Sequence, residues 1–169
     1  MGRYYNTRRK TVLTVNRCNV FVEIYADGAY RAKYKAGGWG VLLRWRGHER
    51  ELFGGERDTT NNRMELTAAI EALKALKRPM SVLLHSDSQY VTRGMNEWCN
   101  NWIANNWYSH TTGMPVKNDD LWKALIAEAA RHEVQWLWVR GHSGHVDNER
   151  ADALANRGAD SVMLPQSIV

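Results

Sequence analysis

The chain has 169 residues, 44% of them hydrophobic and 24% charged, which suits one compact domain with a buried core. It contains no apolar stretch of about eighteen residues, and its start lacks the apolar segment of a secretory signal. From these absences we expect a cytoplasmic protein with no membrane partner. We also expect a monomer. The net charge of +5 indicates an acidic partner such as nucleic acid.

The positive charge is concentrated at the N-terminus. Residues 1–17 hold five basic and no acidic side chains, so the remainder has equal numbers of each. We therefore predict a basic, disordered arm over residues 1–17, a folded domain over residues 18–160 and a C-terminal tail over residues 161–169. The sequence leaves open whether the arm binds substrate, targets an organelle or has no role.

The first part of the chain predicts an antiparallel meander. Period-two alternation and β-branched residues indicate a strand over residues 19–27, which we expect to end at Asp27. Two further strands are predicted over residues 39–45 and 49–55, joined by a short polar turn.

The second part predicts alternating helices and strands. Apolar residues at three- and four-residue spacing begin a helix at Thr60, which Pro79 ends. The remaining expected elements are a strand at 81–84, a helix at 88–98 followed by an irregular stretch to 107, a helix at 119–132 with Asn118 as its N-cap, a strand at 134–139 and a helix at 146–158. This order predicts an α/β fold with a mixed five-stranded sheet, parallel after the meander, and helices on both faces.

Four acidic residues occupy positions that helix solubility does not explain. Asp27 and Asp87 follow predicted strands, where open α/β sheets place their ligands, although a turn or capping role is equally open for either one alone. Glu65 and Asp152 lie on helical stripes with alanines and so are expected to face inward. Close carboxylates repel by about 4 kcal/mol at 4 Å with an effective dielectric near 20, so such a group needs a cation. Oxygen ligands without cysteine or paired histidine indicate Mg²⁺, with Mn²⁺ as a possible substitute.

The sequence words around these acids are YADG at 25–28, TTNNRMEL at 59–66, SDSQYV at 86–91 and VRGHSGHVDNERADALA at 139–155. The segments WCNNW at 98–102 and PVKNDDLW at 115–122 follow in the same order. Together they closely resemble type 1 ribonuclease H of the bacterial kind, over about residues 20–159. The resemblance implies the ribonuclease H-like three-layer fold and hydrolysis of the RNA strand of RNA–DNA hybrids by two metal ions, leaving 5′-phosphate and 3′-hydroxyl ends.

Residue by residue, the resemblance implies that Asp27, Glu65, Asp87 and Asp152 are catalytic metal ligands and that His142 is the mobile catalytic histidine. It also implies a substrate-binding set, which comprises Gly28, Thr60, Asn61, Asn62, Gln89, Trp98, Trp102 and Asn118. Within this set, Gly28, Asn61, Asn62 and Gln89 match positions that read the RNA minor groove. Thr60 and Asn118 match a DNA phosphate pocket, and the two tryptophans match a surface for DNA sugars. A role in the core or in a helix cap remains the alternative for these last four, and we expect His145 to be structural.

Three departures from the family pattern concern substrate binding. A Gly/Pro-rich loop is replaced by residues 30–35, with Lys33 where members use an asparagine. A frequent arginine beside the phosphate pocket is Asp58 here. The normally basic handle has no lysine or arginine between Arg93 and Lys117.

Three other interpretations remain. The chain could be a hybrid-binding module that has lost catalysis, although all four acids and His142 are present. It could be another nuclease or strand-transfer enzyme of the same fold, or a domain from a reverse transcriptase. The TTNNRMEL and GHSGH motifs favour ribonuclease H.

Overall fold

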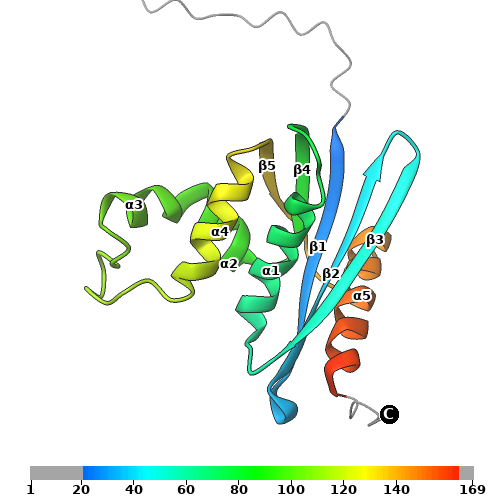
Figure 1. Ribbon diagram of the computed structural model, residues 1–169, viewed down its shortest axis with the longest axis horizontal. Helices are drawn as coiled ribbons and strands as arrows, with labels where there is room; N and C mark the ends of the chain where they lie inside the picture. The colour runs from blue at the N-terminus through cyan, green and yellow to red at the C-terminus, as the bar shows by residue number, and fades with distance from the viewer. Residues whose placement is uncertain (1–20, 164–169) are drawn as a thin grey trace, which may run out of the picture.

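The computed structural model describes residues 21–163. The predicted arm at residues 1–17 and the end of the predicted tail, residues 164–169, lie outside this range. The first three strands form the predicted meander (Figure 1). They are β1 (Val22–Arg31), β2 (Ala36–Trp45) and β3 (His48–Arg57), with a short 3₁₀ turn, η1 (Ala32–Tyr34), between the first two.

The rest of the chain alternates helices with two further strands. The helix α1 (Asn61–Lys74) precedes β4 (Ser81–Ser86), and α4 (Asp119–Ala129) precedes β5 (Glu133–Trp138). Between β4 and α4 lie three short helical segments: α2 (Gln89–Arg93), the π-helical η2 (Gly94–Trp98) and α3 (Cys99–Ala104). The chain ends in α5 (Val146–Met163), and no helix among the described residues is both long and apolar enough to cross a membrane.

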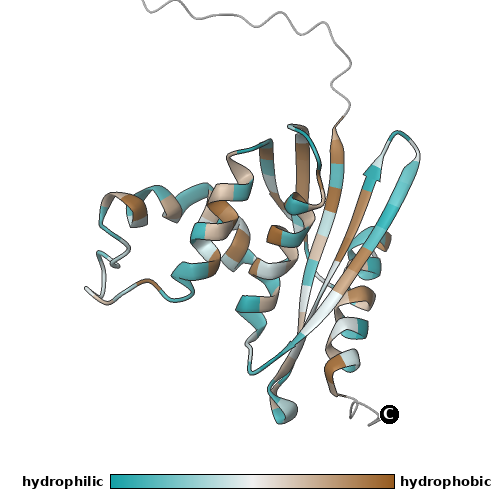
Figure 2. Ribbon diagram, in the orientation of Figure 1, coloured by the Kyte–Doolittle hydropathy of each residue, from teal (hydrophilic) through white to brown (hydrophobic). Residues whose placement is uncertain are grey.

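The sheet has the order β3-β2-β1-β4-β5, antiparallel among the first three strands and parallel between β1, β4 and β5. The predicted mixed five-stranded α/β sheet is therefore confirmed. The helix α1 packs on β1 and β2, with α4 against it, while α5 covers the other face of β1, β2 and β3. Hydrophobic residues gather between these layers, whereas the turn between β2 and β3 is hydrophilic (Figure 2).

The main core lies between the sheet and α1. Its fully buried members include Ile24 from β1, Leu84 from β4, Leu66 and Leu73 from α1, and Trp122 from α4. A second group of small side chains lies under α5, where Ala29 packs against Ala155 and Ala159. Large side chains therefore separate α1 from the sheet, and small ones let α5 approach it closely.

Several predicted boundaries were wrong. The strand β1 does not end at Asp27 but continues to Arg31, because β2 pairs with it along its whole second half. The predicted helix at 88–98 is interrupted, since a π-helical turn occupies Gly94–Trp98 and brings Gly94 against the ring of Trp122. The last helix runs past Gly158 to Met163, because glycine in the middle of α5 fits closely against β2 and β3.

Candidate functional site

Asp27 and Asp87 meet at the edge where the parallel pairing of β1 and β4 stops. The last parallel pair joins Tyr25 to His85. Asp27 lies two residues after Tyr25, and Asp87 lies two residues after His85. Asp27 is 4% exposed, and its Oδ1 accepts a hydrogen bond of 2.8 Å from the backbone N–H of Gly28. The two carboxylates therefore share a register that the sheet itself imposes.

Glu65 comes to the same place from α1. Thr60 caps this helix by accepting a hydrogen bond from the backbone N–H of Arg63, and Glu65 then falls on the inward face, where it is 6% exposed. The strand passes so close to the helix that a Cβ on Gly28 would lie 2.6 Å from the backbone nitrogen of Glu65. A glycine after Asp27 is thus needed for β1 and α1 to bring the two acids together.

The carboxylates of Asp27, Glu65 and Asp87 form one cluster, with an oxygen from each lying within 4.8 Å of the others. Burial and the charges of Asp87 and Asp152 raise the pKa of Asp27 to about 8. Burial, followed by the charges of Asp27 and Asp87, also raises the pKa of Glu65 well above its ordinary value. The cluster therefore resists carrying its full negative charge when no cation is present.

Asp152 approaches this cluster on α5. A Cβ on Gly38 would lie 2.1 Å from the backbone oxygen of Ala155, and one on Gly40 would lie 2.3 Å from that of Ala151. These two glycines of β2 let the helix backbone rest directly on the strand. Asp152 lies outside the three-carboxylate cluster, but it is near enough for its charge to raise the pKa of Asp27.

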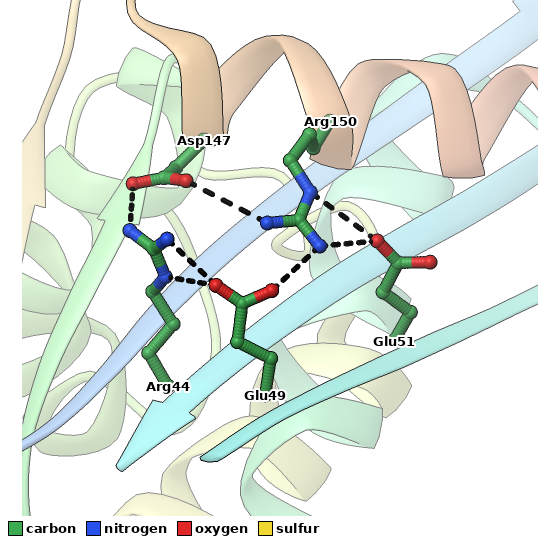
Figure 3. Close-up of polar contacts among 5 residues, drawn as sticks. All are labelled: Arg44, Glu49, Glu51, Asp147 and Arg150. Carbon is green, nitrogen blue, oxygen red and sulfur yellow. Dashed lines mark hydrogen bonds and ion pairs between the residues drawn. The ribbon is translucent and has the colours of Figure 1, made fainter. Parts of the chain in front are cut away.

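An ionic network holds the first turns of α5 to the β2–β3 hairpin (Figure 3). Arg44 on β2 contacts Asp147 at 2.6 Å and Glu49 at 2.6 Å. Arg150 contacts Glu49 at 2.8 Å and Glu51 at 2.6 Å. Arg44 of β2 pairs with one acid of α5 and one of β3, and Arg150 of α5 pairs with two acids of β3, so the network ties the start of α5 to two strands.

The donor set of the cluster suits a hard divalent cation. It consists of carboxylate oxygens, the ligands that Mg²⁺ and Mn²⁺ prefer. Moreover, Oε2 of Glu65 is buried and has no hydrogen-bond partner among residues 21–163, although a buried polar atom normally requires one. A cation bound between the three acids would satisfy this oxygen and offset their repulsion.

His142 lies in the loop between β5 and α5. It is exposed and has a φ of 51°, a left-handed conformation that is uncommon for a residue other than glycine. His145 ends the same loop, with its ring centroid 5.3 Å from that of Tyr25 on β1. This packing agrees with a structural role for His145.

Three of the predicted RNA-reading residues are exposed at helix starts beside the cluster. Asn61 and Asn62 begin α1, and Gln89 begins α2, directly after Asp87 and Ser88. The Nδ2 of Asn61 also donates to Oε1 of Glu65 at 3.4 Å.

The two residues predicted to bind a DNA phosphate, Thr60 and Asn118, lie at the starts of α1 and α4. Asn118 occupies the predicted N-cap position of α4, although its side chain makes no capping hydrogen bond there. With a φ of 58°, its side chain turns away to accept a bond from Arg63 at 3.4 Å and donate one to the hydroxyl of Tyr90 at 3.2 Å. Arg63, which the sequence analysis did not single out, therefore links Asn118 to the helix that Thr60 caps.

The two predicted sugar-binding tryptophans lie side by side, with ring centroids 5.8 Å apart. Trp102 packs edge-on against the buried Trp122 at 5.0 Å and contacts the main core. The core interpretation thus has support for Trp102, while the role of both rings toward DNA remains a prediction.

Trp138, at the end of β5, lies outside every motif that points to the site. Its indole N–H donates to the backbone oxygen of Asp87 at 3.0 Å, and its side chain is half exposed beside the cluster. The signal was present in the register, because parallel pairing places Trp138 opposite Ser86, next to Asp87.

Comparison with known proteins agrees with this geometry. Residues 19–160 match the family model for RNase H. The chain is 59% identical to Ribonuclease HI of Neisseria meningitidis serogroup B, over 83% of this chain and 97% of that protein, and 60% identical to Ribonuclease H of Pseudomonas entomophila, over 83% and 95%. Among solved structures it resembles LC9-RNase H1, a type 1 RNase H with the type 2 active-site motif, with a TM-score of 0.75 and 32% identity over 86% of this chain and 75% of that one.

Proposed function

Because this chain belongs to the ribonuclease H family, we propose that it is an endonuclease that hydrolyses the RNA strand of RNA–DNA hybrids. We assign divalent-metal binding to Asp27, Glu65, Asp87 and Asp152, with Mg²⁺ as the resident ion and Mn²⁺ as a substitute. The observation that carries the proposal is the meeting of three carboxylates within 4.8 Å, two of them buried. Without a cation such a group would be costly to maintain.

Asp27, Glu65, Asp87 and Asp152 would hold divalent ions, and the chemistry these would supply is activation of a water at neutral pH and stabilisation of charge on the scissile phosphate and leaving 3′-oxygen. The protein's own groups provide the rest. Glu65 and Asp27 are held by the close contact of α1 with β1, so their oxygens are oriented before substrate binds. His142, exposed on its loop, is suited to transfer a proton to or from the phosphate or leaving group.

Recognition of the RNA strand follows from the exposed amides beside the cluster. Asn61, Asn62 and Gln89 can donate to and accept from 2′-hydroxyls and base edges in the wide minor groove of a hybrid. The hydroxyl of Thr60 and the amide of Asn118 lie at the starts of neighbouring helices, where a DNA phosphate would be favoured.

The test is cleavage of an end-labelled RNA–DNA duplex beside RNA–RNA and DNA–DNA duplexes of the same sequence, with Mg²⁺ or with EDTA. We expect internal cuts in the RNA of the hybrid alone, and only with the metal. Hybrid binding without cleavage in either Mg²⁺ or Mn²⁺ would replace the proposal with a non-catalytic binding module. Cleavage of the DNA duplex would indicate another nuclease of this fold.

A further inference from the structure

Three polar residues repeat at four-residue spacing along one face of α5: Asp152, Asn156 and Asp160. The Nδ2 of Asn156 donates to Oδ1 of Asp152 at 3.0 Å and to its backbone oxygen at 2.8 Å. Arg31, at the end of β1, donates to Oδ1 of Asn156 at 2.7 Å and contacts Asp160 at 3.4 Å. A continuous chain of hydrogen bonds therefore runs from Arg31 through Asn156 to Asp152.

The chemistry of this chain allows one orientation of the central amide. A guanidinium can only donate, so it must face the carbonyl oxygen of Asn156. The amide NH₂ then points toward Asp152, whose carboxylate can only accept while it is ionised. Because the amide engages one carboxylate oxygen, the other is left to act as a ligand.

The same contact joins β1, which carries Asp27, to α5, which carries Asp152. Along β1, Asp27, Ala29 and Arg31 alternate on one face, and Ala29 packs against Ala155 and Ala159 of α5. Arg31 thus contacts α5 four residues after Asp27, and Asn156 lies one turn after Asp152. Loss of the contact between Arg31 and Asn156 would therefore change the position of Asp152 relative to Asp27.

We infer that Arg31 and Asn156 are positioning residues that hold the carboxylate of Asp152 toward the metal site. Neither touches the reacting atoms; both act through Asp152. The inference rests on the assignment of Asp152 to the metal site under the proposed function. Loss of a partner that orients a metal ligand typically lowers metal affinity or activity by about 10- to 100-fold, and we expect that range here.

The experiment measures Mn²⁺ binding by isothermal titration calorimetry and electron paramagnetic resonance, together with kcat and KM on hybrid. The variants are R31M and N156A, with R31K as the conservative change that keeps a donor to the amide. We expect R31M and N156A to weaken Mn²⁺ binding and raise the metal concentration needed for half-maximal kcat, each by about 10-fold or more. R31K should recover part of both losses, and KM for hybrid at saturating metal should change little.

R157M is the matched control. Like R31M it replaces an arginine by methionine, but at the residue of α5 that follows Asn156. Arg157 is exposed and lies over the ring of Phe53, 4.4 Å from its centroid. The R157M variant should bind Mn²⁺ with the same affinity as the unaltered protein. Circular dichroism and melting temperature verify that each variant is folded.

A double-mutant cycle provides the decisive comparison. In a D152N background, R31M and N156A should produce no further loss of Mn²⁺ affinity, since their route to the metal has been removed. Undiminished losses in that background, or unaltered Mn²⁺ binding by folded R31M and N156A, would overturn the inference. A raised KM with normal metal binding would instead make Arg31 a substrate contact. If the unaltered protein neither binds Mn²⁺ nor cleaves hybrid, the proposed function fails first.

Discussion

At the scale of single residues, the site depends on acids held where their charge is unfavourable. Asp27 illustrates this, since burial and the neighbouring Asp87 and Asp152 raise its pKa from 3.8 to about 8. A residue with such surroundings is costly for the metal-free fold and useful only when a cation binds. Stability and function are therefore expected to oppose each other at this position.

We predict that D27N abolishes cleavage but raises the melting temperature of the metal-free protein. A carboxyl whose pKa is higher in the folded than in the unfolded state contributes stability below its unfolded pKa, and this contribution disappears as the pH rises through its folded pKa. The unfolding free energy of the unaltered protein in EDTA should therefore fall between about pH 4 and pH 8, and that of D27N should fall less.

Urea unfolding in EDTA at several pH values measures this effect, and hybrid cleavage in Mg²⁺ measures the loss of activity. Asn preserves the size of the side chain, so misfolding is not an expected cause of inactivity. Near-normal turnover by D27N in Mg²⁺ would contradict the assignment of Asp27 as a ligand.

At the scale of elements, the position of α5 is set by close packing against glycines and by the ionic network at its start. Gly38 and Gly40 leave room for the helix backbone, while Arg44 and Arg150 connect its first turns to the hairpin. The ion pairs are partly exposed and individually contribute little to stability. The glycine contacts are therefore the stronger constraint on where Asp152 lies.

We predict that G38A destabilises the fold and lowers kcat, because its Cβ would lie 2.1 Å from backbone atoms of Ala155 and Ala159. Overpacking typically costs about 1–3 kcal/mol, and here backbone rather than a flexible side chain must move. Chemical unfolding and steady-state kinetics on hybrid measure the two effects.

G47A is the control, since Gly47 lies in the β2–β3 turn with a φ of 79°, and no atom of the described part of the chain would lie within 4 Å of a Cβ there. It should lose stability through backbone strain, of the order of 1 kcal/mol, with unchanged kcat. Equal kcat losses in both variants would mean that stability, rather than the position of α5, limits activity.

At the scale of the whole molecule, the distribution of charge matters more than its total. The five basic residues of the predicted arm, residues 1–17, equal the net charge of +5. The segment between Arg93 and Lys117, which protrudes from the sheet as α3 and its following loop, has no lysine or arginine. Attraction of a polyanion by the rest of the chain is therefore weak, and the arm can supply what is lacking.

We predict that removing residues 1–17 raises KM for hybrid at moderate salt and leaves kcat at saturation nearly unchanged. Each phosphate that the arm neutralises should contribute about 0.7 to 0.9 to the slope of log affinity against log salt, so the truncated protein should show a shallower slope. Hybrid binding across a salt series measures it.

A full-length variant with the five basic residues of the arm changed to glutamine is the matched control for loss of length. It should reproduce the truncation if charge is the cause. An unchanged KM and an unchanged slope in both variants would show that the arm has no part in substrate binding.

The sequence alone determined the order of the elements, the mixed sheet and the inward direction of Glu65, because these follow from local periodicity and breakers. The sequence motifs shared with the family also identified the acids to be tested as metal ligands. Only the tertiary structure decided that β1 continues past Asp27 and that Arg31 reaches Asn156, residues 125 positions apart in the chain. Such contacts arise from how closely two backbones approach, which depends on side chains from several elements at once and leaves no periodic signal in any one of them.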